Sequence, residues 1–143
     1  MIDKQFELCD RFDMDAIASS TIVTAASLSA SINEYDFGGA NHQNALSSIR
    51  FRAEISSDSS AALAGDTIQI ILQDAADSSG SSGTYSSILY SFIWPASSAT
   101  PAGQILLDVG LPLDLKQWFR ASIKPGGAIS STSYLSMYLY TLR

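Results

Sequence analysis

The last third of the chain contains two runs in which apolar and polar side chains alternate. They are residues 118–124 (WFRASIK) and residues 134–140 (YLSMYLY), and Pro125-Gly126-Gly127 lies between them. Alternation with a period of two is typical of β-strands with one buried face, and Pro-Gly-Gly is a turn signal. The two runs therefore predict two closing strands joined by a turn region.

Similar patterns predict further strands upstream, at 17–23, 31–37, 48–55, 67–73, 84–94 and 104–109. Period two places Ile68, Ile70 and Leu72 on the inward face of their strand. It also groups side chains on one face of two other strands: Ile49, Phe51, Ala53 and Ile55 in a half-buried strand, and Ile88, Tyr90, Phe92 and Trp94 in the longest strand. No internal helix is predicted. The expected fold class is all-β: a jelly-roll-like β-sandwich of about eight strands, formed by residues 16–143 as a single domain.

The same alternation divides the two closing strands into an inner and an outer side. Phe119, Ala121, Ile123, Leu135, Met137 and Leu139 form the aliphatic side, which we expect in the core. Trp118, Arg120, Lys124, Tyr134, Tyr138 and Tyr140 form the aromatic and basic side. Trp, Tyr and Arg are enriched at protein interfaces, so this side predicts contact with another chain. The alternative is that the inner and outer sides are reversed and the rings lie in the core.

Residues 1–15 differ from the rest of the chain, because Phe6, Leu8 and Phe12 are interspersed with acidic residues. Terminal segments stay disordered unless they dock on something. We interpret this segment as an N-terminal arm that uses these three side chains to dock on a neighbour. The alternative is a segment folded back on its own domain.

The overall charge narrows the class of partner. The formal net charge is −6, and Lys and Arg form no cluster. We therefore expect no direct binding to nucleic acid and none to anionic membranes. The N-terminus lacks the pattern of a signal peptide, and no apolar run reaches the ~20 residues of a membrane span. Cys9 is the one cysteine, so no internal disulfide can form.

Residue types that carry catalysis are not combined in any recognised motif. His42 is the one histidine and has no partners at metal-ligand spacing. We expect no enzymatic activity, no catalytic residues, no cofactor and no dedicated metal site. Weak calcium binding stays open at two acidic stretches, Asp10/Asp13/Asp15 and Asp74/Asp77, although neither has the full pattern of a calcium loop.

Several stretches resemble the small jelly-roll capsid cement (decoration) proteins of tailed bacteriophages. Residues 33–38 (NEYDFG) look like that family's early strand end, and 24–27 (TAAS) is similar to the small run before it. Residues 67–74 (TIQIILQD) resemble its central strand. Leu111-Pro112 followed by 118–123 (WFRASI) is similar to its step into an aromatic strand.

The resemblance implies a structural virion protein with no catalytic residues. Such a protein is made in the host cytoplasm and lies on the outer surface of the capsid, where it binds the major capsid protein and copies of itself as a homodimer or homotrimer. The residues leave two alternatives open. One is a carbohydrate- or receptor-binding jelly-roll module with Trp94 or Trp118 as a stacking platform, and the other is a tail or neck accessory protein.

Overall fold

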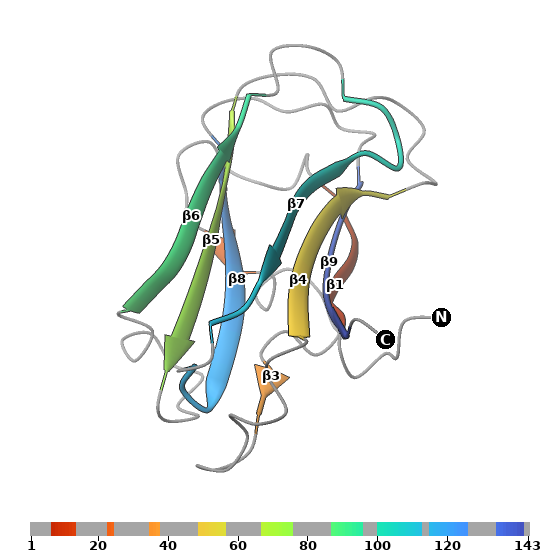
Figure 1. Cartoon of the computed structure of the whole chain (residues 1–143). Helices are drawn as coiled ribbons and strands as arrows, with labels where there is room; N and C mark the ends of the chain where they lie inside the picture. Colours follow the sequence, from red (N-terminus) through yellow and green to blue (C-terminus); the bar gives the residue numbers. More distant parts are fainter. Residues whose placement is uncertain are drawn as a thin grey trace.

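The chain folds into two antiparallel β-sheets that pack face to face as a β-sandwich (Figure 1). The computed structural model describes residues 7–13, 23–24, 35–37, 49–56, 67–75, 87–95, 100–112, 115–125 and 134–141. Sheet A has the order β1 (Glu7–Asp13), β9 (Tyr134–Thr141), β4 (Ile49–Ile55) and β7 (Ile105–Gly110). Sheet B has the order β2 (Val23–Thr24), β8 (Trp118–Pro125), β5 (Ile68–Ala75) and β6 (Ser87–Trp94), and β3 (Tyr35–Asp36) also pairs with β8. The expectation of an all-β sandwich is confirmed.

The core lies between the sheets and is built from alternate residues of the central strands. Phe51 of sheet A and Phe119 of sheet B meet there with ring centroids 6.2 Å apart. The inward faces predicted for β4 and β5, and the aliphatic side predicted for β8 and β9, are all buried. The predicted inner sides of these four strands are therefore confirmed. Alternation could predict them because a strand turns successive side chains to opposite faces.

The two closing strands do not pair with each other. β8 is hydrogen-bonded to β5 in sheet B, and β9 is hydrogen-bonded to β4 in sheet A. The outer sides of β8 and β9 consequently face in opposite directions. The expectation of two strands is confirmed, and the turn region between them, residues 126–133, lies outside the described residues.

The short strands β2 and β3 lie along the same edge of β8. Val23 and Thr24 are opposite Ile123 and Ser122, whereas Tyr35 and Asp36 are opposite Phe119 and Trp118. Both run antiparallel to β8, so they occupy successive positions of one interrupted edge.

The N-terminal strand belongs to the sandwich itself. β1 pairs with β9, and Leu8 is 1% exposed within the core. Glu7–Asp13 therefore folds back on its own domain, which was the alternative to an arm that docks on a neighbour. Leu8 is thereby corrected from an interface residue to a core residue.

A β-bulge changes the face on which one residue of β6 lies. Tyr90 pairs with Leu72, but Ile88 pairs with Gln73, which leaves Leu89 as the extra residue. Because an inserted residue reverses the side-chain alternation, Ile88 moves to the outer face, where it is 61% exposed. The prediction that Ile88 shares a face with Tyr90, Phe92 and Trp94 is wrong. Among the described residues no helix has the length and apolar character to cross a membrane.

Candidate functional site

The predicted aromatic and basic side is divided between two opposite surfaces. Trp118, Arg120 and Lys124 lie on the outer face of sheet B, whereas Tyr134, Tyr138 and Tyr140 lie on that of sheet A. Tyr138 is only 8% exposed, and one partner surface cannot contact both groups at once. The prediction of a single aromatic and basic contact surface is therefore corrected to two separate surfaces.

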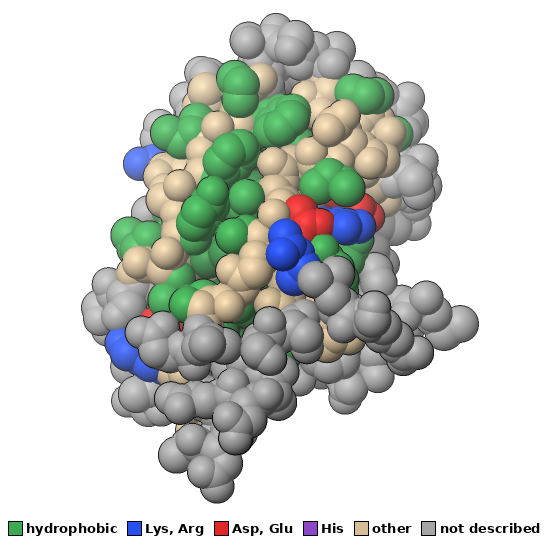
Figure 2. All heavy atoms as spheres, viewed as in Figure 1, with side chains coloured by type: hydrophobic (Ala, Val, Ile, Leu, Met, Phe, Trp, Pro, Cys, Tyr) green, Lys and Arg blue, Asp and Glu red, His purple; other side chains and the backbone are tan. Residues whose placement is uncertain are grey.

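The outer face of sheet A carries a charged cluster made by Arg50, Arg52, Asp108 and Tyr140. Arg50 Nε donates to Asp108 Oδ1 at 2.8 Å, and Arg52 Nη2 donates to Asp108 Oδ2 at 2.6 Å. The Tyr140 hydroxyl donates to the same carboxylate at 2.6 Å. The Arg52 guanidinium also lies 4.8 Å from the centroid of the Tyr140 ring. In Figure 2 this cluster is the blue and red group on the right.

The cluster keeps Asp108 ionised. Partial burial disfavours the charged carboxylate, but hydrogen bonds from Tyr140, Arg50 and Arg52 outweigh that cost and hold the pKa of Asp108 below its usual range. The hydrogen bond to Asp108 in turn raises the pKa of Arg52 above its already high value. Tyr140 is therefore engaged inside the subunit, and Tyr138 offers little surface to a partner because it is 8% exposed.

The other two predicted N-terminal contact residues, Phe6 and Phe12, are not placed at an interface by the structure. Phe12 lies on β1 opposite Leu135, and Phe6 is outside the described residues. Residue Tyr134 at the start of β9 is half-buried, as are Trp118 and Arg120.

The exposed large hydrophobic side chains of the described residues all lie on β6 and β7. They are Ile88, Tyr90, Ile93 and Ile105, which we call the apolar edge. β6 and β7 are edge strands of the two sheets, and Figure 2 shows hydrophobic side chains along the side of the molecule where these strands lie. Sequence reasoning missed this surface, because the bulge that exposes Ile88 has no local signature.

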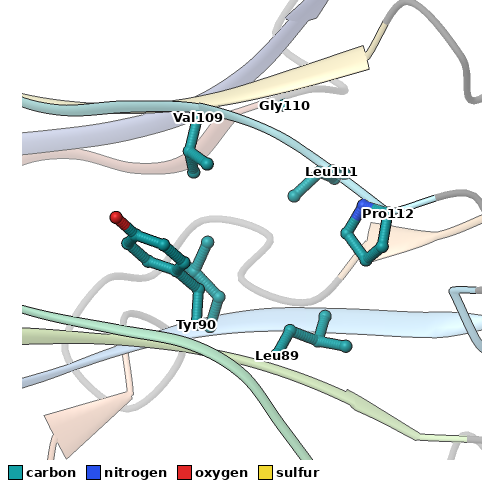
Figure 3. A pocket seen from close by; sticks show the side chains of 7 residues that line it. Leu89, Tyr90, Val109, Gly110, Leu111 and Pro112 are labelled. Atoms are coloured by element: carbon teal, nitrogen blue, oxygen red, sulfur yellow. The ribbon is translucent and has the colours of Figure 1, made fainter.

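A small hollow opens between the two edge strands (Figure 3). Its volume is about 240 Å³, and its lining is mainly apolar: Leu72, Leu89, Tyr90, Val109, Gly110, Leu111 and Pro112. Tyr90 and Val109 point toward one another across it. A hollow of this size fits one large side chain of a partner.

The two tryptophans proposed as glycan platforms have different surroundings. Trp94 is half-buried against the core, and its indole N–H donates to Thr100 Oγ1 at 3.1 Å. Trp118 lies at the start of β8, opposite Ala75 of β5 and Asp36 of β3. A stacking platform needs an exposed ring face flanked by polar groups, and Trp94 does not present one.

The acidic stretches considered for calcium do not form a metal site within the described residues. Those residues contain no group of three or more His, Cys, Asp or Glu side chains that could hold a metal ion. Asp74 is 2% exposed, and its Oδ2 accepts a hydrogen bond from the Lys116 backbone N–H at 3.0 Å. The Lys116 ammonium lies 3.8 Å from Asp74 Oδ1. Asp15, Asp77 and His42 lie outside the described residues.

Comparison with known proteins adds no relative to this description. A scan against protein-family models finds no match to the chain, and a search of curated proteins finds none either.

Proposed function

We propose that this protein is a capsid decoration protein, which binds the outer surface of a phage head and stabilises contacts between major capsid subunits. The observation that carries the proposal is the apolar edge on β6 and β7. Exposed apolar side chains that gather beside an apolar hollow mark a surface used for protein contact. The chain's resemblance to phage cement proteins supplies the class of partner.

We also propose that the sandwich is an eight-stranded jelly roll. In this interpretation β2 and β3 are two parts of one strand, since they occupy successive positions along β8. The strand orders β1-β9-β4-β7 and β2-β8-β5-β6 support it, because the first strand pairs with the last and most connections cross between the sheets. Jelly rolls are frequent among viral capsid domains.

The energy available from the apolar edge is sufficient for a repeated contact. Burying about 300 Å² of apolar surface contributes about 7 kcal/mol before the costs of association are subtracted. A single contact of that size is weak. Repetition of the contact over a shell, in which copies also contact each other, makes the whole layer stable.

A binding experiment tests this function. Purified protein is mixed with expanded phage heads prepared without it, and bound protein is measured after sedimentation of the heads. We expect saturable binding of the wild-type protein. The double variant Tyr90→Ser, Ile105→Ser should bind at least tenfold more weakly. The control is Thr141→Ser, a substitution at an exposed position on β9 that should leave binding unchanged. Absence of binding by the wild-type protein would refute the function, and electron microscopy of bound particles separates a head location from a tail or neck location.

A further inference from the structure

The charged cluster on sheet A holds two arginines against a single carboxylate. Arg50 and Arg52 are two residues apart on β4, so their side chains lie on the same face of the sheet. The Nε atoms of both donate to Asp108, at 2.8 Å and 2.9 Å. Because tyrosine is uncharged at neutral pH, two guanidinium groups and one carboxylate give the cluster one net positive charge. The chain as a whole carries a net charge of −6.

Arg50 uses only one edge of its guanidinium group inside the cluster. Its Nε donates to Asp108 Oδ1 and to the Tyr140 hydroxyl, and its Nη2 donates to the Asp108 carbonyl oxygen at 3.2 Å. Its Nη1 has no hydrogen-bond partner among the described residues. A guanidinium group has five N–H donors in a fixed fork, so the end formed by Nη1 and Nη2 keeps donors for a further acceptor. The Arg50 side chain is 32% exposed, which leaves this end within reach of a partner.

Gly110 leaves open space beside Nη1 of Arg50. This glycine is exposed and lies opposite Arg50 in the pairing of β4 with β7. A Cβ added there would lie 3.7 Å from Nη1, and beyond the neighbouring residues of the chain no other atom would be within 4 Å. Gly110 also lines the apolar hollow (Figure 3). The unused end of the guanidinium group therefore lies next to the hollow.

The other acidic residues near the outer side of β4 lie farther along the sheet. Glu54 is four residues from Arg50, about 13 Å along the strand. Burial and, next in the same direction, the charge of Glu54 raise the pKa of Tyr138, so this carboxylate acts on the opposite end of the face. Glu7 of β1 lies opposite Tyr138, and β9 separates it from β4. The end of Arg50 beside Gly110 is thus the place where this face is open to a carboxylate from outside.

We propose that Arg50 binds a carboxylate of the partner protein whose apolar side chain occupies the hollow. The inference rests on the proposed function and adds to it the chemistry of the partner: a segment with an acidic residue beside a large apolar one. A carboxylate is planar and accepts two parallel N–H bonds from the end of a guanidinium group. The apolar lining of the adjacent hollow favours an amino-acid side chain over a sugar or a phosphate.

The carboxylate contributes selectivity more than binding strength. Arg50 is partly exposed, and ion pairs at such positions are worth little because water and salt screen them. We therefore expect a severalfold preference for an acidic segment at about 0.1 M salt, where the Debye length is about 10 Å. The preference should largely disappear at about 1 M salt, where that length is about 3 Å.

Two capped tripeptides, acetyl-Glu-Phe-Glu-amide and acetyl-Gln-Phe-Gln-amide, test the inference without phage heads. Binding to the purified protein is measured by nuclear magnetic resonance titration. We expect the Glu peptide to bind at least threefold more tightly and to shift the Arg50 Nε–H signal. The net charge of the protein repels the Glu peptide, so a preference for it requires a local cation.

Matched variants assign the preference to Arg50. Arg50→Gln should bind the two peptides equally, whereas Arg120→Gln, which removes the same charge from the outer face of sheet B, should keep the preference. Arg50→Lys keeps the charge but lacks the fork, and it should keep only part of the preference. Gly110→Leu covers Nη1 without changing any charge and replaces Arg50→Gln if that variant fails to fold. Circular dichroism checks the fold of each variant.

The outcomes separate this inference from the proposed function. Equal binding of the two peptides to the wild-type protein, or binding of neither, overturns the carboxylate site whether or not the protein binds heads. A preference that Arg50→Gln abolishes supports the site even if head binding fails. Self-association that depends on Arg50, measured by sedimentation velocity without heads, would assign the carboxylate to a second copy and overturn the assignment to another protein.

Discussion

Two phenylalanine rings hold the two sheets together at the centre of the core. Phe119 is fully buried and contacts both Phe51 of sheet A and Phe37, whose ring centroid lies 6.3 Å away. Both contacts cross between separate segments of the chain, so removal of the ring leaves a cavity that no single strand can fill by a local shift.

We predict that Phe119→Ala lowers the free energy of unfolding by about 3–5 kcal/mol, as is usual for a buried ring. Phe119→Leu keeps most of the volume and is expected to cost less, about 1–2 kcal/mol. Urea denaturation measures both. Equal stability of the alanine variant and the wild-type protein would contradict the assignment of Phe119 to the core.

The charged cluster on sheet A makes the free energy of unfolding depend on pH in the acidic range. The pKa of Asp108 is lowered in the folded protein, so its contribution is complete above about pH 4, the ordinary range of an aspartate, and is lost as the pH falls through the folded value. We predict that Asp108→Asn lowers stability by about 1–2 kcal/mol at pH 7 and flattens the decline between about pH 4 and pH 2.

Thermal unfolding measured across that pH range checks the prediction for Asp108. Tyr140→Phe removes one of the three side chains that donate to the carboxylate and is the matched control, with an effect between those of the wild type and the asparagine variant. Parallel stability curves for the wild type and Asp108→Asn would show that the cluster does not stabilise the fold.

At the scale of elements, one turn fixes where β7 begins. The Gln104 N–H donates to the Pro101 carbonyl at 3.2 Å, and the Gly103 N–H donates to the Ile55 carbonyl at 2.8 Å. Gly103 has φ of 80°, a left-handed conformation that residues with a Cβ adopt at a cost. The turn therefore sets the register between β4 and β7 and thereby the position of Asp108 opposite Arg52.

We predict that Gly103→Ala lowers stability by about 1 kcal/mol, whereas Gly103→Asn costs less because Asn tolerates the left-handed region. No atom lies within 4 Å of the Cβ that a substitution would add, so the cost comes from the backbone alone. Chemical denaturation of the two variants separates these values. A larger loss for asparagine than for alanine would point to a clash instead.

On the scale of the whole molecule, local stability against opening should fall from the centre of each sheet toward its edge strand, β7 in sheet A and β6 in sheet B. β9 and β4 in sheet A, and β8 and β5 in sheet B, have hydrogen-bonded neighbours on both sides, whereas β6 and β7 have one neighbour each. We predict that amides of the four central strands exchange with deuterium only through global unfolding and that those of β6 and β7 exchange faster. Exchange of β6 as slow as that of β5 would indicate that its edge is covered, as it would be in an assembly.

Local patterns in the chain were enough to predict the central strands β4, β5, β8 and β9 and their inner sides. Side-chain alternation is a property of a single strand, so Phe51, Ile70, Phe119 and Met137 could each be assigned to the core from their neighbours in sequence. The net charge also followed from composition, and it is the basis of our expectation that the protein does not bind nucleic acid.

The tertiary structure alone decided which surfaces those strands create. Strand order placed β8 and β9 in different sheets and so divided the aromatic side chains between two surfaces. A bulge moved Ile88 outward, and pairing gathered Asp108 between two arginines from another strand. These outcomes depend on contacts between residues far apart in the chain, which a period of two does not encode.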